Sequence, residues 1–171
     1  MALLRDPSKD VQVLAIYGLG HLCNHRCDAD LLALEDHPEP AIRQGVALSL
    51  MGTTLPAAVP VLLQLMADPY VKARDWATTT LGSAECFDGP KIREALMQRV
   101  TVDEDDIIRG EALRGLARGD RRAAPLIAAE LARSGARYWA FEAAAKICLG
   151  LDEYSSVEAE ELIVDLRAVR H

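Results

Sequence analysis

The chain has 171 residues and a formal net charge of −7, and its composition is 50% hydrophobic but only 5% aromatic. This length suffices for one domain with a sizeable core, and the negative charge disfavours general binding to nucleic acids and other polyanions. No apolar run reaches the roughly 18 residues that cross a bilayer, and no secretory signal is visible, so we expect a cytoplasmic protein with reduced cysteines and no membrane partner.

One pattern recurs five times along the chain and predicts its architecture. Each copy begins with an apolar residue and a second, mostly polar residue, which we take as the reference residue; a small or branched apolar residue follows at position +3 and a large aliphatic residue at +7. The reference residues stand at 12, 43, 74, 109 and 140, so the copies are 31, 31, 35 and 31 residues apart. A period of this size is typical of a solenoid, whose repeats stack to share one core.

Each repeat is expected to form two antiparallel helices. The predicted second helices cover about 8–22, 40–52, 70–84, 105–118 and 137–149; the first helices cover about 29–36, 56–67, 89–101 and 121–133, and a capping helix covers about 156–169. The predicted fold is all-α, a right-handed α–α superhelix of about ten helices in a single domain. Its repeats are expected at about 1–27, 28–54, 55–86, 87–120 and 121–150, with a cap over 151–171.

The first repeat contains only the end of a first helix. Leu3 and Leu4 match that end, whereas the rest of the helix has no counterpart. The apolar side chains of helix 8–22 are therefore expected to lack packing partners: Val11, Leu14, Ile16, Tyr17 and Leu19. Exposed apolar patches usually become interfaces, so we expect this end to be covered, most simply by a second copy in a two-fold dimer or otherwise by upstream residues of a longer parent protein.

Residues 59–82 resemble the short HEAT-like repeats of phycobilin lyases. The matching features are Val59-Pro60-Val61-Leu62-Leu63, then Asp68-Pro69, Arg74, Ala77 and Leu81-Gly82. The resemblance extends over nearly the whole chain. It implies a hydrogen-bonded ladder in which turn aspartates and helix arginines stabilise neighbouring repeats. On this basis Asp68 with Arg74 and Asp103 with Arg109 are structural pairs, and His37 with Arg43 and Asp6 with Gln12 are degenerate rungs of the ladder.

Enzymes with similar repeats supply the alternative function. Deoxyhypusine hydroxylases need paired His-Glu dipeptides for two irons, and this sequence has none. DNA glycosylases of the HEAT-like class use a basic concave face; here only residues 107–137 are basic, with arginines at 109, 114, 118, 121, 122, 133 and 137. Phycobilin lyases share the repeat, which by itself carries no bilin chemistry. The alternative is thus an enzyme or enzyme subunit of phycobilin-lyase-like or DNA-repair-like type, and no cofactor is predicted.

One cluster holds residue types that bind zinc: His21, Cys23, His25 and Cys27. On a helix the two histidines share a face while the cysteines lie about 200° away, so four ligands could not meet one ion. An extended segment would place all four on one side. We expect Cys23 in the core and the histidines exposed, with zinc as the weaker alternative.

The inner face carries the main functional prediction. Positions +2, +5, +6 and +9 are expected to point toward a groove formed by the stacked second helices. The predicted binding residues are Tyr17, Leu48, Trp76, Thr79, Thr80, Glu111, Arg114 and Arg118. Trp76 fits either an aromatic binding residue or lateral packing between helices, while Tyr138, Trp139 and Phe141 are expected in the core. We therefore expect a non-enzymatic scaffold that binds a protein or peptide.

Overall fold

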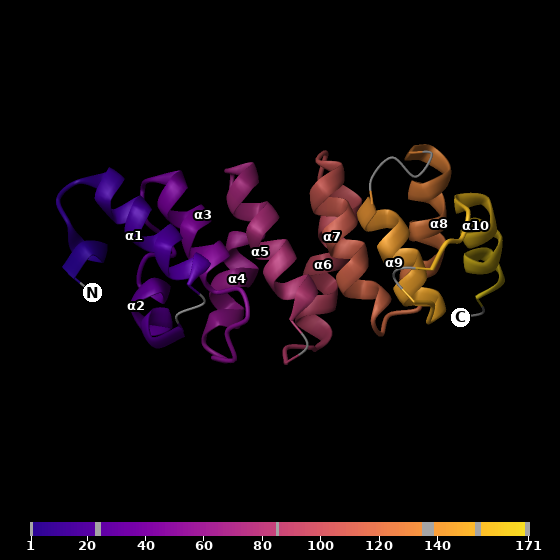
Figure 1. The fold of residues 1–171 in the computed structure, drawn as a ribbon, viewed down its shortest axis with the longest axis horizontal. Coiled ribbons are helices and arrows are strands. Elements are labelled where there is room, and N and C mark those ends of the chain that lie inside the picture. The colour runs from indigo at the N-terminus through magenta and orange to yellow at the C-terminus, as the bar shows by residue number, and fades with distance from the viewer. Residues whose placement is uncertain (1, 23–24, 85, 135–138, 153–154, 170–171) are drawn as a thin grey trace. The chain divides into compact units, whose positions relative to one another are not determined.

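The computed structural model describes residues 2–22, 25–84, 86–134, 139–152 and 155–169, shown as a ribbon in Figure 1. All regular secondary structure in these ranges is helical, with α-helices α1 to α10 and two short 3-10 helices, η1 and η2. The chain divides into two compact units, Met1–Asp88 and Gly89–His171.

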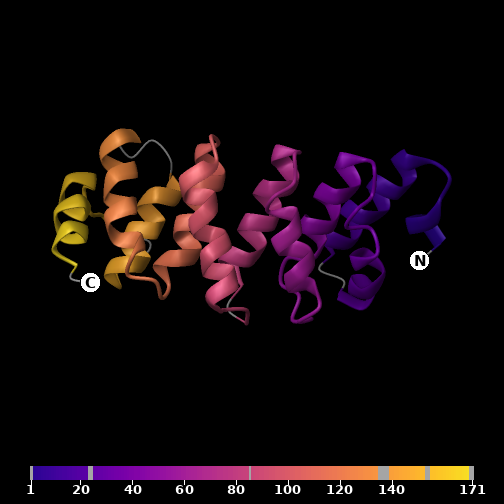
Figure 2. The same ribbon diagram turned by 180° about the vertical axis from the view of Figure 1, so that it is seen from behind.

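The first unit contains two layers of helices. Its elements are η1 (Ala2–Arg5), α1 (Lys9–His21), η2 (His25–Cys27), α2 (Asp28–Leu32), α3 (Pro40–Ser49), α4 (Ala58–Leu65) and α5 (Val71–Ser83). The second helices α1, α3 and α5 pack in this order along one layer, while α2 and α4 form the other (Figures 1 and 2). Fully buried aliphatic side chains such as Leu31, Ile42, Leu50 and Leu62 make up its core.

The second unit repeats this arrangement. It comprises α6 (Pro90–Val102), α7 (Asp106–Ala117), α8 (Ala123–Ser134), α9 (Trp139–Leu149) and α10 (Ala159–Ala168). The second helices α7 and α9 pack against each other, α6 packs on α7, and α8 contacts both α9 and α10. Its core contains Leu113, Leu116, Ile127, Phe141 and Leu162.

The predicted all-helical repeat fold is confirmed, with helix ends within a few residues of those expected. The largest difference at a helix start is in α10, which begins at Ala159 rather than near 156. The Ser155 hydroxyl donates to the Asp152 carbonyl at 2.6 Å, and the residue that precedes the helix is Glu158.

A repeated hydrogen-bond pattern shapes the turn before each second helix. The side chain at position −6 accepts the backbone N–H two residues later: Asp6 from Ser8 at 2.8 Å, His37 from Glu39 at 3.1 Å, Asp68 from Tyr70 at 2.8 Å and Asp103 from Asp105 at 3.3 Å. His37 accepts through Nδ1 and so replaces the aspartate of the other turns. Such local bonds favour a turn over continued helix, which explains why the helices stop here.

The reference residue then fastens its helix to the same turn. Its side chain donates to the backbone carbonyl six residues earlier: Gln12 to Asp6 at 2.7 Å, Arg43 to His37 at 2.7 Å, Arg74 to Asp68 at 2.9 Å and Arg109 to Asp103 at 3.1 Å. Asp68 and Arg74 thus meet through a backbone carbonyl, as do Asp103 and Arg109.

One complete rung of the ladder joins consecutive repeats in the first unit. Arg43 Nε donates to Asp68 Oδ2 at 2.6 Å and Arg43 Nη2 to Asp68 Oδ1 at 2.9 Å, and both side chains are largely buried. Burial would raise the pKa of Asp68, but the bonds from Arg43 and from the Tyr70 N–H, with the nearby positive charges, hold that pKa below its usual value. The prediction that Arg43 belongs to a degenerate rung is therefore wrong.

In the second unit the arginine rung uses a different acid. The turn before α9 has Ser134 at position −6, so no turn aspartate is present. Arg109 Nε instead donates to Glu130 Oε1 of α8 at 3.0 Å. A bidentate or charge-assisted bond of this kind is stronger than a neutral one, so the substitution preserves the link between helices.

Candidate functional site

Contacts between second helices show which way each repeat position points. The Ser49 hydroxyl, at +6 in α3, donates to the Ile16 carbonyl at 2.7 Å, and the Thr80 hydroxyl, at +6 in α5, donates to the Ala47 carbonyl at 3.0 Å. At +2 in α3, a Cβ on Gly45 would lie 2.6 Å from Ile16 Cγ2. Positions +2 and +6 therefore face the preceding second helix in this unit.

This orientation corrects part of the predicted groove. Thr80 is only 2% exposed and Leu48 only 9%, so both belong to helix packing instead of an open surface. Gly45 and Ser49, also expected along the groove, are buried as well. Helical periodicity predicts that these positions point away from the first helices. It could not show that the neighbouring second helix covers them.

In the first unit, the predicted binding residues that retain some exposure are Tyr17, Trp76 and Thr79, all half-buried. Burial and the neighbouring Tyr70 raise the pKa of the Tyr17 phenol, so it is a neutral hydroxyl at physiological pH. Trp76 occupies position +2, the one through which Gly45 meets α1. The register of α5 thus favours the lateral-packing interpretation of Trp76.

The second unit presents a preorganised aromatic–cation pair. The Arg114 guanidinium lies over the ring of Trp139, with Cζ 4.8 Å from the ring centroid, and Arg114 Nη1 donates to Glu111 Oε2 at 2.9 Å. Glu111 is buried, whereas Trp139 is 56% exposed. Arg114 is thus held from two sides, and it brings α7 and the start of α9 together beside an accessible indole.

The expectation of a buried Trp139 is wrong. The same position is fully buried in three other repeats, where it holds Ile42, Ala73 and Ile108. Trp139 begins α9, so its side chain leaves from the first turn of the helix. Phe141 is completely buried as expected, and Tyr138 lies outside the described residues.

Other polar side chains on the second helices of this unit differ in accessibility. Arg118 is exposed at the end of α7. Next along α9, Lys146 is buried and pairs with Glu142 at 2.7 Å. The second helices of this unit thus carry two ion pairs, Arg114 with Glu111 on α7 and Lys146 with Glu142 on α9.

Four of the seven arginines in the basic segment 107–137 form ion pairs with the three acids of that segment. Arg109 and Arg133 pair with Glu130, Arg114 pairs with Glu111, and Arg122 pairs with Asp120. The hydrogen bond from Arg122 lowers the pKa of Asp120, which keeps this carboxylate charged. Arg137 lies outside the described residues. The pairing leaves seven arginines against three acids, so the local charge of the segment remains +4.

The metal candidate is only partly within the structure. His21 is exposed at the end of α1, and Cys27 is buried directly before α2. Cys23 and the side chain of His25 lie outside the described residues. Over the part of the chain that is described, no three His, Cys, Asp or Glu side chains are grouped so that they could hold an ion.

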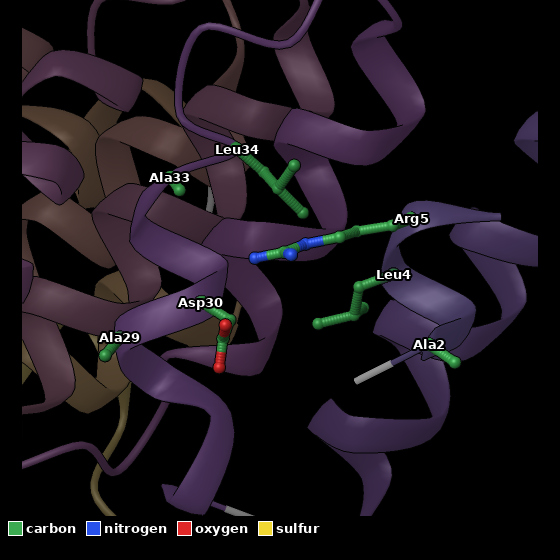
Figure 3. A pocket seen from close by; sticks show the side chains of 7 residues that line it. All are labelled: Ala2, Leu4, Arg5, Ala29, Asp30, Ala33 and Leu34. Atoms are coloured by element: carbon green, nitrogen blue, oxygen red, sulfur yellow. The ribbon is translucent and has the colours of Figure 1, made fainter.

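A cavity of about 310 Å³ lies in the first unit between η1 and the α2 segment. Its lining residues are Ala2, Leu4, Arg5, Ala29, Asp30, Ala33 and Leu34. Figure 3 shows the Arg5 side chain reaching from η1 toward α2, with Leu4 and Leu34 on either side. The walls are mostly apolar, with one basic group, Arg5, and one acidic group, Asp30.

Comparison with known proteins agrees with this architecture. The family model of HEAT repeats matches residues 1–82, which confirms the resemblance to HEAT-like repeats. The chain is also similar to the X-ray structure of YibA from Escherichia coli, with a TM-score of 0.69 and 19% sequence identity over 97% of this chain. It spans 64% of the YibA chain, and at this identity the likeness concerns the fold alone. No curated protein matches the sequence.

Residues 1–82 are therefore HEAT repeats, and both units have the HEAT-like helical repeat fold. Among the described helices, none combines the length and the apolar character that crossing a membrane requires.

Proposed function

We propose that this protein is a non-enzymatic scaffold that binds a protein or peptide on its second-helix surface, with Trp139 and Arg114 at the centre of the contact in the second unit. The observation that carries the proposal is the exposed indole with an ordered guanidinium across its face. Tryptophan and arginine dominate the energetically important residues of protein interfaces. HEAT repeats generally mediate protein interactions, which is consistent with this use of the surface.

The contacts of Arg114 indicate the chemistry of the partner. Its charge is already balanced by the buried Glu111, and its guanidinium covers part of one face of the Trp139 ring. The surface therefore offers a partner apolar aromatic area more than net charge. An apolar side chain packed against the indole would gain from burial, and the fixed Arg114 would lose little conformational freedom on binding.

Peptide selection tests the proposal directly. Peptides chosen from a random display library against the wild-type protein should lose at least about tenfold in affinity for Trp139→Ala, because removing a central tryptophan costs on the order of 2 kcal/mol or more. Binding is measured by calorimetry. Val164→Ala serves as the control, since Val164 is an exposed apolar residue on α10. Selected peptides that bind Trp139→Ala as tightly as the wild type would contradict the proposal.

The site residues predicted in the first unit can be examined with the same peptides. Tyr17, Trp76 and Thr79 are the half-buried members of that set. Tyr17→Ala and Thr79→Ala should weaken binding less than Trp139→Ala, because neither position presents an exposed aromatic ring held by a cation.

A further inference from the structure

Helix α1 has an apolar face that nothing in the described structure covers. Leu14 is 73% exposed and Leu22, directly after the helix, is 76% exposed. Gly18 lies between them on the same side, and a Cβ at this glycine would meet no heavy atom within 4 Å. Together with the half-buried Val11, these residues form a stripe with the i, i+3, i+7, i+11 spacing of a helix-packing face, here called the α1 stripe.

The α1 stripe continues an interface that the fold already uses. Counted from the reference residue Gln12, Leu14 stands at +2 and Gly18 at +6. In α3 the same positions hold Gly45 and Ser49, and both of these contact α1. The α1 stripe therefore occupies the repeat positions through which α3 packs against α1.

Its chemistry, however, differs from that of the internal interfaces. Ser49 and Thr80 each place a hydroxyl at +6 that bonds to a backbone carbonyl of the preceding helix. Gly18 has no hydroxyl to repeat this bond. At +2, the small Gly45 of α3 is replaced by the large Leu14. The α1 stripe thus presents a projecting leucine and, one helical turn further on, an empty hollow.

A projection and a hollow one turn apart on a single helix complement themselves under two-fold rotation. When two copies of α1 pack antiparallel about a point between residues 14 and 18, Leu14 of each copy lies over Gly18 of the other. Small residues at a helix crossing allow such close approach, and isologous two-fold contacts are the commonest in soluble oligomers. We propose that the α1 stripe binds a second copy of this chain in this antiparallel arrangement.

Charge placement along α1 agrees with the antiparallel pairing. The stripe itself, Val11, Leu14, Gly18 and Leu22, carries no ionisable group. Asp10 lies in the first turn of α1 and His21 in the last. Antiparallel packing brings the acidic first turn of one copy beside the last turn of the other, and it opposes the two helix dipoles favourably. Ile16, which was expected to be short of partners, is instead fully buried against α3, so it does not take part.

Sedimentation equilibrium over a concentration series tests the proposal. The wild type should dimerise reversibly, and Leu14→Glu should raise the dissociation constant at least about tenfold, as expected for loss of a central apolar contact. Gly18→Leu should weaken the dimer as well, because it fills the hollow. Val164→Glu makes the same kind of change at another exposed apolar residue and should leave the dissociation constant unchanged. Circular dichroism confirms that each variant is folded.

Cross-linking distinguishes the antiparallel geometry. An oxidised mixture of Leu14→Cys and Gly18→Cys should give more disulfide-linked dimer than either variant alone, with the wild type as the background for the natural cysteines. A wild type that is monomeric at every concentration would overturn the proposal, as would a dimer that Leu14→Glu leaves intact. Cross-linking that is no greater in the mixture would overturn the antiparallel arrangement. These variants do not change Trp139 or Arg114, so the dimer proposal can fail while peptide binding by the second unit is unaffected.

Discussion

Helices α1 and α3 are consecutive second helices with the same repeat register, yet they use the same positions differently. In α3, Gly45 and Ser49 are buried against α1, the glycine by close approach and the serine by a hydroxyl bond. In α1, the matching Leu14 and Gly18 face open space. The register therefore determines where a side chain points, whereas the neighbouring helix determines whether that direction is core, interface or surface.

The turns before α3 and α5 show a second contrast. Asp68 accepts two bonds from the charged Arg43 of the previous repeat. At the equivalent places one repeat earlier stand His37 and Gln12, so an imidazole and an amide replace the carboxylate and the guanidinium. Both turns nevertheless keep their internal hydrogen bonds. The residue at position −6 can thus both close its own turn and bind the arginine of the previous repeat. Within this unit every repeat keeps the turn bond, whereas the arginine bond described here is made by Asp68.

The largest expected difference in stability is between replacing a buried leucine and replacing an exposed one. Leu50→Ala removes a fully buried side chain from α3's end and should lower the free energy of unfolding by about 2–5 kcal/mol, because a cavity remains in the core. Leu14→Ala should change it by less than about 0.5 kcal/mol at protein concentrations where the chain is monomeric. Chemical denaturation measures both. Similar losses at the two positions would show that the register has been assigned wrongly.

A smaller effect is expected from breaking the rung between repeats. Asp68→Asn removes the charge that Arg43 binds and should cost about 1.5–3 kcal/mol at neutral pH. Asp6→Asn, at the same position of the first repeat, serves as the matched control. It should cost less than about 1 kcal/mol, because the hydrogen bond described for the Asp6 side chain is the one from the Ser8 N–H of its own exposed turn.

The contribution of Asp68 should also depend on pH. Its pKa is lowered in the folded protein, so its stabilisation is complete above the unfolded value of about 4 and is lost as pH falls through the lower folded value. The stability difference between wild type and Asp68→Asn should therefore shrink between about pH 5 and pH 2. A difference that stays constant over this range would argue against a charged pair with Arg43.

The smallest expected stability changes come from replacing Gly45 or Gly18 with alanine, and they have opposite signs. Gly45→Ala should destabilise the protein by about 1–3 kcal/mol, because its new Cβ would collide with Ile16 unless the helices shift. Gly18→Ala should stabilise the monomer by about 0.5–1 kcal/mol, since alanine favours helix and the site is open. Thermal unfolding at low protein concentration measures both. A gain in stability from Gly45→Ala would contradict the close packing of α1 and α3.

Much of the fold follows from the sequence because the repeat period, the turn residues and the aliphatic positions all agree. Phe141, which was expected in the core, is completely buried. The exposure of Trp139 could not be predicted from the repeat, because the position before the reference residue is apolar in every copy. It is fully buried in three of them, and the change at Trp139 depends on where α9 begins. The partner of Arg43 was missed because the pairing runs to the next repeat, 25 residues away, and not to its own turn.

The candidate site was only partly predictable from the sequence. Helical periodicity separated the core face of the second helices from their other sides, but it could not divide those sides between a solvent surface and a neighbouring helix. Thr80 was placed on the surface and proved buried, because its hydroxyl meets the Ala47 carbonyl of the adjacent helix. Arg114 was predicted as a surface residue, while its position over Trp139 depends on the packing of α9 against α7.

The central claim is that the same repeat position is buried against a neighbouring helix in α3 and open to a second copy of the chain in α1. Thiol labelling at position +6 tests this claim most directly. Gly18→Cys and Ser49→Cys place the same probe at the same repeat position, and mass spectrometry resolves each from the natural cysteines. We expect slow labelling of Ser49→Cys at every concentration, and fast labelling of Gly18→Cys that slows as protein concentration rises. Equal labelling of the two probes, or a rate at Gly18→Cys that is independent of concentration, would contradict the account.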